Sequence, residues 1–379
     1  MIYLDYNATA PLWPAVKRRI IDALDVSGNP SSVHSSGRNA RALVEKARGE
    51  IASSFGATHE NIIFTSGATE ANTLALAGSK RRRVLVSGIE HLSVLEAVGD
   101  VEKIAVDQAG LVSSECLANL LRQDANSALV SIMLANNETG VIQPIAELAR
   151  MAHEYGALFH CDAVQAPGRI PLHMDDLGVD MMTLSAHKIG GPKGIGALIL
   201  APGVEIASVL SGGGQERGRR GGTENVPAIA GFGAAAMHVN EMLDKAEHIS
   251  KLRDEMERAI LEQVPEVVIH GHRAPRLVNT SLFGVDGVSA ETQVIALDLS
   301  GIAVSSGSAC SSGKVAPSHV LRAMGLSESM SISSVRVSIG VETKDEEIGR
   351  FVDAWVSSLK IIKRQVNAAQ SMNGSGGTL

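Results

Sequence analysis

The chain of 379 residues is long enough for about two domains, since a domain commonly contains roughly 150 residues. Hydrophobic residues make up 45% and charged residues 20%, so the composition excludes an intrinsically disordered protein. The 34 basic and 41 acidic side chains give a net charge of −7, which argues against electrostatic binding of nucleic acid.

The first residues and the hydropathy pattern bear on where the protein is located. Residues 1–7 include the acidic Asp5 and no basic region ahead of an apolar run, so they do not predict a secretion signal. No uncharged stretch approaches the roughly 20 apolar residues that span a bilayer. The three cysteines are too few for a disulfide framework. We therefore expect a soluble cytoplasmic protein with no membrane and no nucleic-acid partner.

Short apolar runs alternate with amphipathic segments through the first two thirds of the chain. Strands separated by helices indicate βαβ units and a mostly parallel sheet, that is, an α/β fold. The predicted strands are 62–65, 83–87, 129–133, 158–162, 181–185 and 195–200. The predicted helices are 40–55, 70–78, 114–123, 145–155 and 226–258, the last in one or two pieces.

The pattern changes after Pro265, where shorter strands and helices follow one another. The predicted strands are 267–270, 277–283, 304–306 and 335–338, and the predicted helices are 291–299 and 345–363. We interpret this region as a second, smaller α+β domain.

The first segment that could carry chemistry lies between a predicted strand and a predicted helix that begins near Thr69. Free N–H groups at a helix start can bind a phosphate, and the hydroxyls of Ser66 and Thr69 would add donors. An ordinary helix cap explains the same residues and is the more common case for an isolated turn.

Asp162 and Lys188 follow the ends of neighbouring predicted strands, where ligands of open α/β sheets bind. Lysines normally lie on solvated faces, and a desolvated lysine can form a Schiff base with pyridoxal phosphate (PLP). Enzymes that use PLP also place an acid beside the pyridinium nitrogen, which Asp162 could provide. Asp162 could instead cap the following turn, and Lys193 competes with Lys188 for the cofactor.

Two glycine-rich segments complete the candidates. Residues 212–223 set three arginines among glycines and could bind an anion, although a flexible surface loop explains this segment better when it is taken alone. Cys310 lies in a run of Ser and Gly that cannot contribute to a core, so chemical reactivity explains it better than packing. Cys116 and Cys161 lie in a predicted helix and strand and are expected in the core.

These segments occur in one order along nearly the whole chain and resemble the group I (NifS/IscS-like) cysteine desulfurases, a PLP-dependent class-V aminotransferase family. The matching segments are 3–11, 29–34, 65–70, 90–91, 136–140, 160–165, 185–194, 212–223 and 306–312. The resemblance implies the aspartate-aminotransferase-like (type I) fold, with a mostly parallel seven-stranded sheet and a smaller α+β domain. We expect a large domain at 15–258, a small domain formed by 1–14 and 259–366 that carries Cys310 on a mobile loop, and a disordered tail at 367–379.

The resemblance also implies a role for each matching residue. The expected catalytic residues are Lys188, which would carry the cofactor, His91, which would stack on its ring, and Cys310, the nucleophile. The residues expected to bind PLP are Ala68, Thr69, His91, Asn137, Asp162, Gln165, Ser185, His187, Lys188 and Thr223. Arg336 and Asn137 would bind the substrate, with the planar guanidinium of Arg336 on its carboxylate. Thr223 matches a contact that the other subunit supplies, which implies a homodimer.

The activity implied by the resemblance is the conversion of L-cysteine to L-alanine, with the sulfur held as a persulfide on Cys310. The sulfur would pass to an acceptor or iron–sulfur scaffold protein, on which Cys310 could also ligate a cluster transiently. A PLP-dependent aminotransferase or a cysteine or selenocysteine lyase of the same fold is an alternative that would not need Cys310. An inactive assembly partner is a further alternative, but it should have lost Lys188 or Cys310.

Overall fold

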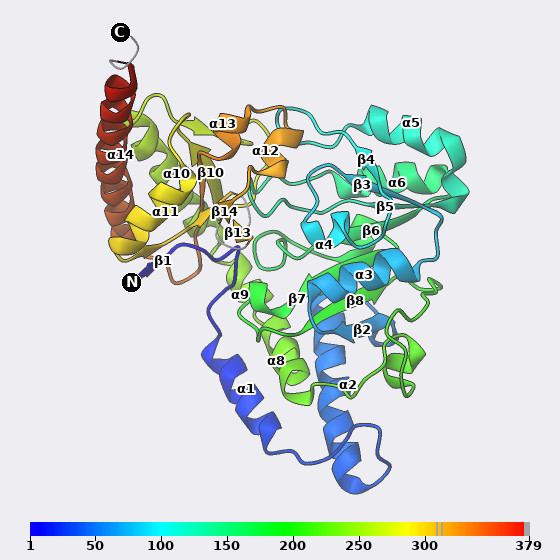
Figure 1. Ribbon diagram of the computed structural model, residues 1–379. Helices are drawn as coiled ribbons and strands as arrows, with labels where there is room; N and C mark the ends of the chain where they lie inside the picture. The colour runs from blue at the N-terminus through cyan, green and yellow to red at the C-terminus, as the bar shows by residue number, and fades with distance from the viewer. Residues whose placement is uncertain (308–309, 312–313, 375–379) are drawn as a thin grey trace.

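The computed structural model describes residues 1–307, 310–311 and 314–374 and builds them around a seven-stranded sheet (Figure 1). The strand order is β2-β8-β7-β6-β5-β3-β4. The bounds are Ile62–Thr65 (β2), Arg83–Ser87 (β3), Glu102–Ile104 (β4), Ala128–Ser131 (β5), Leu158–Asp162 (β6), Met181–Ser185 (β7) and Gly196–Leu200 (β8). Strands β3 to β7 are parallel, and β8 is antiparallel to both β2 and β7. The predicted mostly parallel seven-stranded sheet is therefore confirmed.

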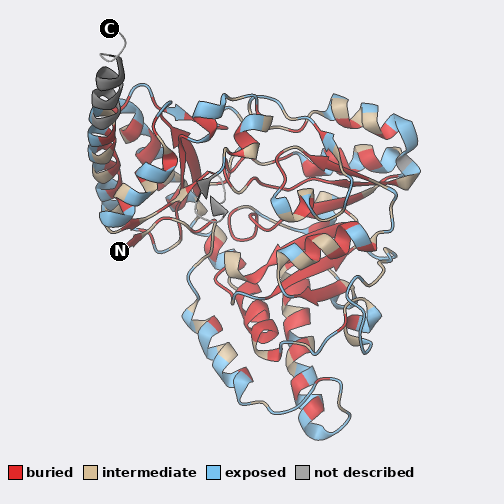
Figure 2. Ribbon diagram, in the orientation of Figure 1, coloured by how far each residue is buried: buried red, intermediate tan, exposed pale blue. Residues whose placement is uncertain are grey.

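Alternate residues of each strand point into different hydrophobic cores, because side chains of a strand alternate between the two faces of the sheet. Ile62 and Phe64 of β2 pack into the core beneath one face, whereas Ile63 packs beneath the other. Strands β2, β5, β7 and β8 are consequently buried throughout, and β3 and β6 are buried after their first residue (Figure 2), which is the burial expected of a sheet that is covered on both sides.

Helices supply the cover on each face. The helices around this part of the chain are Pro14–Leu24 (α1), Ser35–Phe55 (α2), Ala68–Gly78 (α3), Leu92–Leu95 (α4), Ser114–Asp124 (α5), Ile145–Glu154 (α6), Met174–Leu177 (α7), Val226–Ala236 (α8) and Val239–Leu243 (α9). Residues of α2, α5, α6 and α8 share one core, and residues of α3 and α4 share the other. The region predicted as a helix in one or two pieces, 226–258, is interrupted twice and contributes to three helices.

A second core lies between a four-stranded antiparallel sheet and three helices. The sheet order is β12-β15-β10-β9, with bounds Ser305–Ser306 (β12), Ser334–Ser338 (β15), Thr280–Gly284 (β10) and Val268–Ile269 (β9). The helices are Ala246–Gln263 (α10), Ala290–Leu299 (α11) and Asp345–Gly374 (α14). Trp355 of α14 lies fully buried against Phe283 of β10, with the ring centroids 5.1 Å apart.

The N-terminal strand joins this second core. Strand Ile2–Tyr3 (β1) pairs in parallel with Ile302–Ala303 (β11), and Leu4 is fully buried. Buried residues of α10 belong to the same core, so the expected domain boundary at 258 falls inside a helix. We therefore propose that the smaller domain begins at α10 and includes the first residues of the chain.

The remaining strands and helices lie in the Cys310 segment or after it. Strand Cys310–Ser311 (β13) pairs with Lys314–Val315 (β14), and helices His319–Ala323 (α12) and Glu328–Ser331 (α13) follow. Helix α14 continues through residue 374, whereas a disordered tail was expected from residue 367; residues 375–379 lie outside the described chain. The acidic first turn of α14 favours this helix through the helix dipole. Within the described chain, no helix combines the length and the apolar character needed to cross a membrane.

Candidate active site

Lys188 and Asp162 lie at the same edge of the large sheet. Asp162 is the last residue of β6 and pairs with Thr183 on the neighbouring parallel strand β7. Lys188 ends a short 3-10 turn, Ala186–Lys188, that follows β7 directly. Because parallel strands end at a common edge, the two polar side chains reach the site that binds ligands in α/β sheets.

The amine of Lys188 is held inside the protein by backbone carbonyls. Its Nζ donates to the carbonyl oxygens of Asn7 at 2.5 Å and Ala8 at 3.0 Å. Burial, with the nearby charges of Arg336 and Arg169, lowers the pKa of Lys188 to about 7. At neutral pH a large fraction of the amine is therefore uncharged, which is the form that attacks an aldehyde.

A continuous chain of hydrogen bonds connects Asp162 to His91. Asp162 accepts from the Asn72 side chain at 2.8 Å and from the backbone N–H of Val164 at 3.0 Å. Asn72 also donates to the Ser93 hydroxyl at 2.9 Å, which lies 2.8 Å from His91 Nδ1. The Ser93 N–H donates to the same nitrogen, so the ring of exposed His91 is held by the start of α4.

The start of helix α3 is open to a ligand. Its N-cap residue is Gly67, which has no side chain to cap the helix, and a methyl group at Gly67 would meet no atom within 4 Å. Strand β8 approaches this turn closely, because a Cβ on Gly196 would lie 2.9 Å from the nitrogen of Ala68. Thr69 is exposed beside the free N–H groups. An ordinary side-chain cap, the more common interpretation of the sequence, is thus not what the structure has here.

His187 and Ser185 place further polar groups near Lys188. The Nδ1 atom of half-buried His187 has no hydrogen-bond partner among the described residues, and Ser185 is buried. Burial, together with the charges of Lys188 and Lys193, lowers the pKa of His187 to about 4, so its ring is neutral. A partly desolvated lysine, an acid on the neighbouring strand and an uncapped helix start fit the aldehyde, ring nitrogen and phosphate of PLP.

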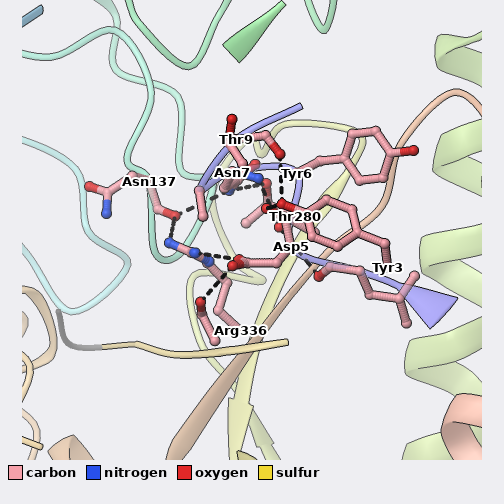
Figure 3. Close-up of polar contacts among 12 residues, drawn as sticks. Tyr3, Asp5, Tyr6, Asn7, Thr9, Asn137, Thr280 and Arg336 are labelled. Atoms are coloured by element: carbon pink, nitrogen blue, oxygen red, sulfur yellow. Dashed lines mark hydrogen bonds and ion pairs between the residues drawn. The ribbon is translucent and has the colours of Figure 1, made fainter. Parts of the chain in front are cut away.

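Arg336 lies between the N-terminal segment and the Asn136–Gly140 turn (Figure 3). Its guanidinium donates to Asp5 at 2.7 Å and to the carbonyl oxygen of Asn137 at 3.0 Å. The Nε atom is buried without a partner among the described residues, so it remains available to an anion. Gln165 donates to the carbonyl oxygen of Asn7 at 3.1 Å, the same atom that Lys188 contacts.

Two buried carboxyl groups belong to this region but were missed from the sequence. Glu90 accepts from the Ser87 hydroxyl at 2.5 Å and from the Met133 N–H at 2.8 Å. Burial raises the pKa of Glu90 to about 8 and that of Glu138 to about 7. Their positions in the sequence could have identified them. Glu90 precedes His91 and Glu138 follows Asn137, and both lie in segments that match the family.

Thr223 is exposed and lies on a loop that the protein holds firmly. Arg48 of α2 forms a buried bidentate ion pair with Glu216, at 2.9 Å for both contacts, and Arg220 contacts Glu70 of α3 at 2.7 Å. Glu216 adopts a φ of 47°, a left-handed conformation that the ion pair maintains. Residues 212–223 are therefore a surface loop, as the sequence alone favours, and ion pairs tie Glu216 and Arg220 of this loop to helices α2 and α3.

The three cysteines differ in their surroundings. Cys161 is fully buried in β6, and half-buried Cys116 packs against the same core, as expected. Cys310 opens β13, between β12 and α12. Residues 308–309 and 312–313, within the predicted loop, lie outside the described chain. The structure therefore gives the backbone pairing of Cys310 and leaves its chemistry to be inferred.

Comparisons with known proteins are consistent with this arrangement. A sequence profile of the family described as Aminotransferase class-V matches residues 2–351. Cysteine desulfurase IscS of Dictyoglomus turgidum is 41% identical over 367 residues, which cover 93% of each chain. The structure of a NifS-like protein from Rickettsia africae has a TM-score of 0.88 at 40% identity and covers 95% of this chain and 99% of that one. A structure of SspA in complex with cysteine has a TM-score of 0.75 at 31% identity, over 90% and 99% of the chains.

The profile match over most of the chain, with a lysine and an acid at the carboxyl edge of the sheet, defines the class as PLP-dependent enzymes of the type I fold. The relatives narrow this class. The chain belongs to the cysteine desulfurases of the class-V aminotransferase family.

Proposed function

We propose that this enzyme removes the sulfur atom from L-cysteine, leaves L-alanine and carries the sulfur as a persulfide on Cys310. The observation that carries the proposal is the half-buried Lys188, whose amine is held by two backbone carbonyls and whose lowered pKa suits covalent attachment of PLP. Cys310 supports the same function, because chemical reactivity explains a cysteine in a Ser/Gly-rich sequence better than a role in a core does.

The residues around Lys188 would hold the cofactor in a defined orientation. We assign the N–H groups at Ala68 and Thr69, with Ser185, His187 and Thr223, to the phosphate. Asp162 would hold the ring nitrogen, and Gln165 and Asn137 would contact groups at the ring edge. When bound, PLP supplies an electron sink that makes the α-proton of an attached amino acid acidic.

The remaining residues would act on the substrate. Arg336 would bind the carboxylate of L-cysteine, since its buried Nε has no hydrogen-bond partner in the described part of the chain and its guanidinium is desolvated. Lys188, once it has released the cofactor, or His91 would take the α-proton. The Cys310 thiolate would then attack the substrate sulfur, so that a new S–S bond forms on Cys310 as the Cβ–S bond breaks. The electron pair of the broken bond would stay with Cβ, which takes up a proton and becomes the methyl group of L-alanine.

The assembly and partners follow from the same proposal. Thr223 is exposed on a loop anchored to the start of α3, which supports a contact with a second copy of the chain in a homodimer. A persulfide must be discharged, so we infer a sulfur-acceptor or iron–sulfur scaffold protein, on which Cys310 could be a transient cluster ligand. The composition supports a cytoplasmic location, where such thiols stay reduced.

The experiment that tests the function replaces Cys310. Cys310→Ala should still bind PLP and still show a spectral change with L-cysteine, because Lys188 and Arg336 are unchanged. It should release almost no sulfide or alanine, and mass spectrometry should find the added sulfur of the wild-type protein on the peptide with Cys310. Cys116→Ala and Cys161→Ala are the controls and should lose at most stability, about 1 kcal/mol. Wild-type turnover in Cys310→Ala would replace the persulfide mechanism with a direct lyase.

A further inference from the structure

The segment that contains Cys310 is fixed on its C-terminal side by a buried hydrogen bond. Ser318, fully buried before α12, donates its hydroxyl to Glu138 at 2.6 Å. The same hydroxyl oxygen accepts from the N–H of Leu321 at 3.1 Å and caps the helix. Next to it, His319 Nε2 lies 2.8 Å from the carbonyl oxygen of Glu90. This end of the segment is therefore held by Glu138 and Glu90, which are neighbours of Asn137 and His91.

The N-terminal side is fixed in an equivalent way. Ser305 pairs with Arg336 across strands β12 and β15, and its hydroxyl donates to Asp5 at 2.9 Å. Gly307 then donates its N–H to the carbonyl oxygen of Ser334 at 3.1 Å. A Cβ on Gly307 would lie 3.2 Å from the Glu138 carboxylate, so both ends of the segment approach that group.

Arg336 connects the two carboxylates. It forms an ion pair with Asp5 at 2.7 Å and donates to the backbone of Asn137, the residue before Glu138. Its positive charge also stabilises the ionised form of Glu138 and so opposes the effect of burial. The arginine that we assign to the substrate carboxylate thus lies between the two acids that hold the Cys310 segment.

We propose that Asp5 and Glu138 are positioning residues for Cys310, which hold Ser305 and Ser318 at fixed places on either side of Arg336. This inference rests on the proposed function, since it needs Cys310 as the nucleophile and Arg336 as the binding group. Fixed ends limit where Cys310 can reach relative to a substrate bound at Arg336. Positioning of this kind can raise the reaction rate by a large factor, because a small displacement of the reacting atoms slows the reaction strongly.

The test removes each hydroxyl from the holoenzyme and follows two separate steps. Ser318→Ala and Ser305→Ala should each slow sulfur transfer to Cys310 about tenfold in a single turnover, measured by mass spectrometry. The spectral titration with L-cysteine should change less than twofold, because no group that binds cofactor or substrate is altered. Ser318→Thr restores the hydroxyl and should recover most of the rate.

Ser333→Ala is the matched control, since Ser333 is fully buried in the same domain and its hydroxyl contacts only the carbonyl oxygen of Ser329 among the described residues. Transfer rates of Ser318→Ala and Ser305→Ala that match the rate of this control would overturn the proposal, as would equal losses of substrate binding and transfer. Failure of the proposed function looks different: Cys310→Ala would then keep its turnover, whatever the serine variants do.

Discussion

At the scale of single residues, burial decides which lysine is chemically competent. Lys188 and Lys193 are five positions apart and both follow β7, yet Lys193 is exposed whereas Lys188 is held by the N-terminal segment. The sequence could place Lys188 beside Asp162 because both follow apolar strands. It could not place Asn7 there, since that contact joins residues 181 positions apart.

Replacement of Lys188 tests this assignment. Lys188→Ala should abolish the covalent attachment of PLP, because Lys188 alone of the two candidates has a buried amine at the edge of the sheet. The intact mass after borohydride reduction measures the attachment. Lys193→Ala is the control and should retain it. Attachment that persists in Lys188→Ala and disappears in Lys193→Ala would reverse the assignment.

The lowered pKa of Lys188, about 7, predicts a pH dependence of cofactor loading. Below this pKa the amine is protonated and cannot attack, so loading of the apoprotein with added PLP should fall about tenfold for each pH unit. Above about pH 8 the amine is almost fully neutral, and the rate should level off. Nα-acetyl-lysine, with an ordinary pKa of about 10.4, is the reference and should continue to rise. A protein profile that still rises at pH 9 contradicts the assigned pKa.

At the scale of elements, the buried strands were predicted more accurately than the edge strand β4 and the long-range contacts of loops. Strands β2, β3, β6 and β7 have the predicted bounds, because their short apolar runs are buried on both faces. Strand β4 was missed, since a three-residue edge strand with the sequence Glu-Lys-Ile has no apolar run. The anchored loop at 212–223 was also missed, because the Arg48–Glu216 pair joins residues far apart in the chain.

The ion pair between Arg48 and Glu216 should be a strong element of stability. Glu216→Gln leaves the buried Arg48 charge with only the exposed carboxylate of Glu45, at 3.4 Å, and should lower the free energy of unfolding by about 3–5 kcal/mol. Urea unfolding measures the change. Glu154→Gln is the control, because Glu154 pairs with Arg150 on an exposed helix face, and it should cost about 1 kcal/mol or less. Equal losses in the two variants would show that the loop is not anchored by this pair.

At the scale of the whole molecule, the active site is assembled from residues of both the large and the small sheet. Lys188 and Asp162 come from the large sheet, whereas Arg336 comes from β15 of the smaller one. Thr223, by contrast, is exposed on the surface of a single chain. The sequence indicated the residues of this site through the family resemblance, while the dimer remains a prediction that one chain cannot test.

Mixed dimers test whether the sites are shared between subunits. Dissociated and reassociated Lys188→Ala and Thr223→Ala chains should form heterodimers in which one site carries both changes and the other carries neither. About half of the wild-type activity per heterodimer should therefore return, although each parent dimer is impaired. A heterodimer no more active than the mean of its parents would mean that each chain uses its own Thr223.

The pairing of β1 with β11 has a consequence for how the protein is made. Ile2 lies beside Ile302, so the first strand leaves the ribosome 300 residues before its partner. At synthesis rates of about 5–20 residues per second, this is a wait of roughly 15 to 60 seconds. Asn7, whose backbone holds Lys188, follows this strand closely. The large sheet can form while synthesis continues, but the lysine obtains its final surroundings only when the chain is nearly complete.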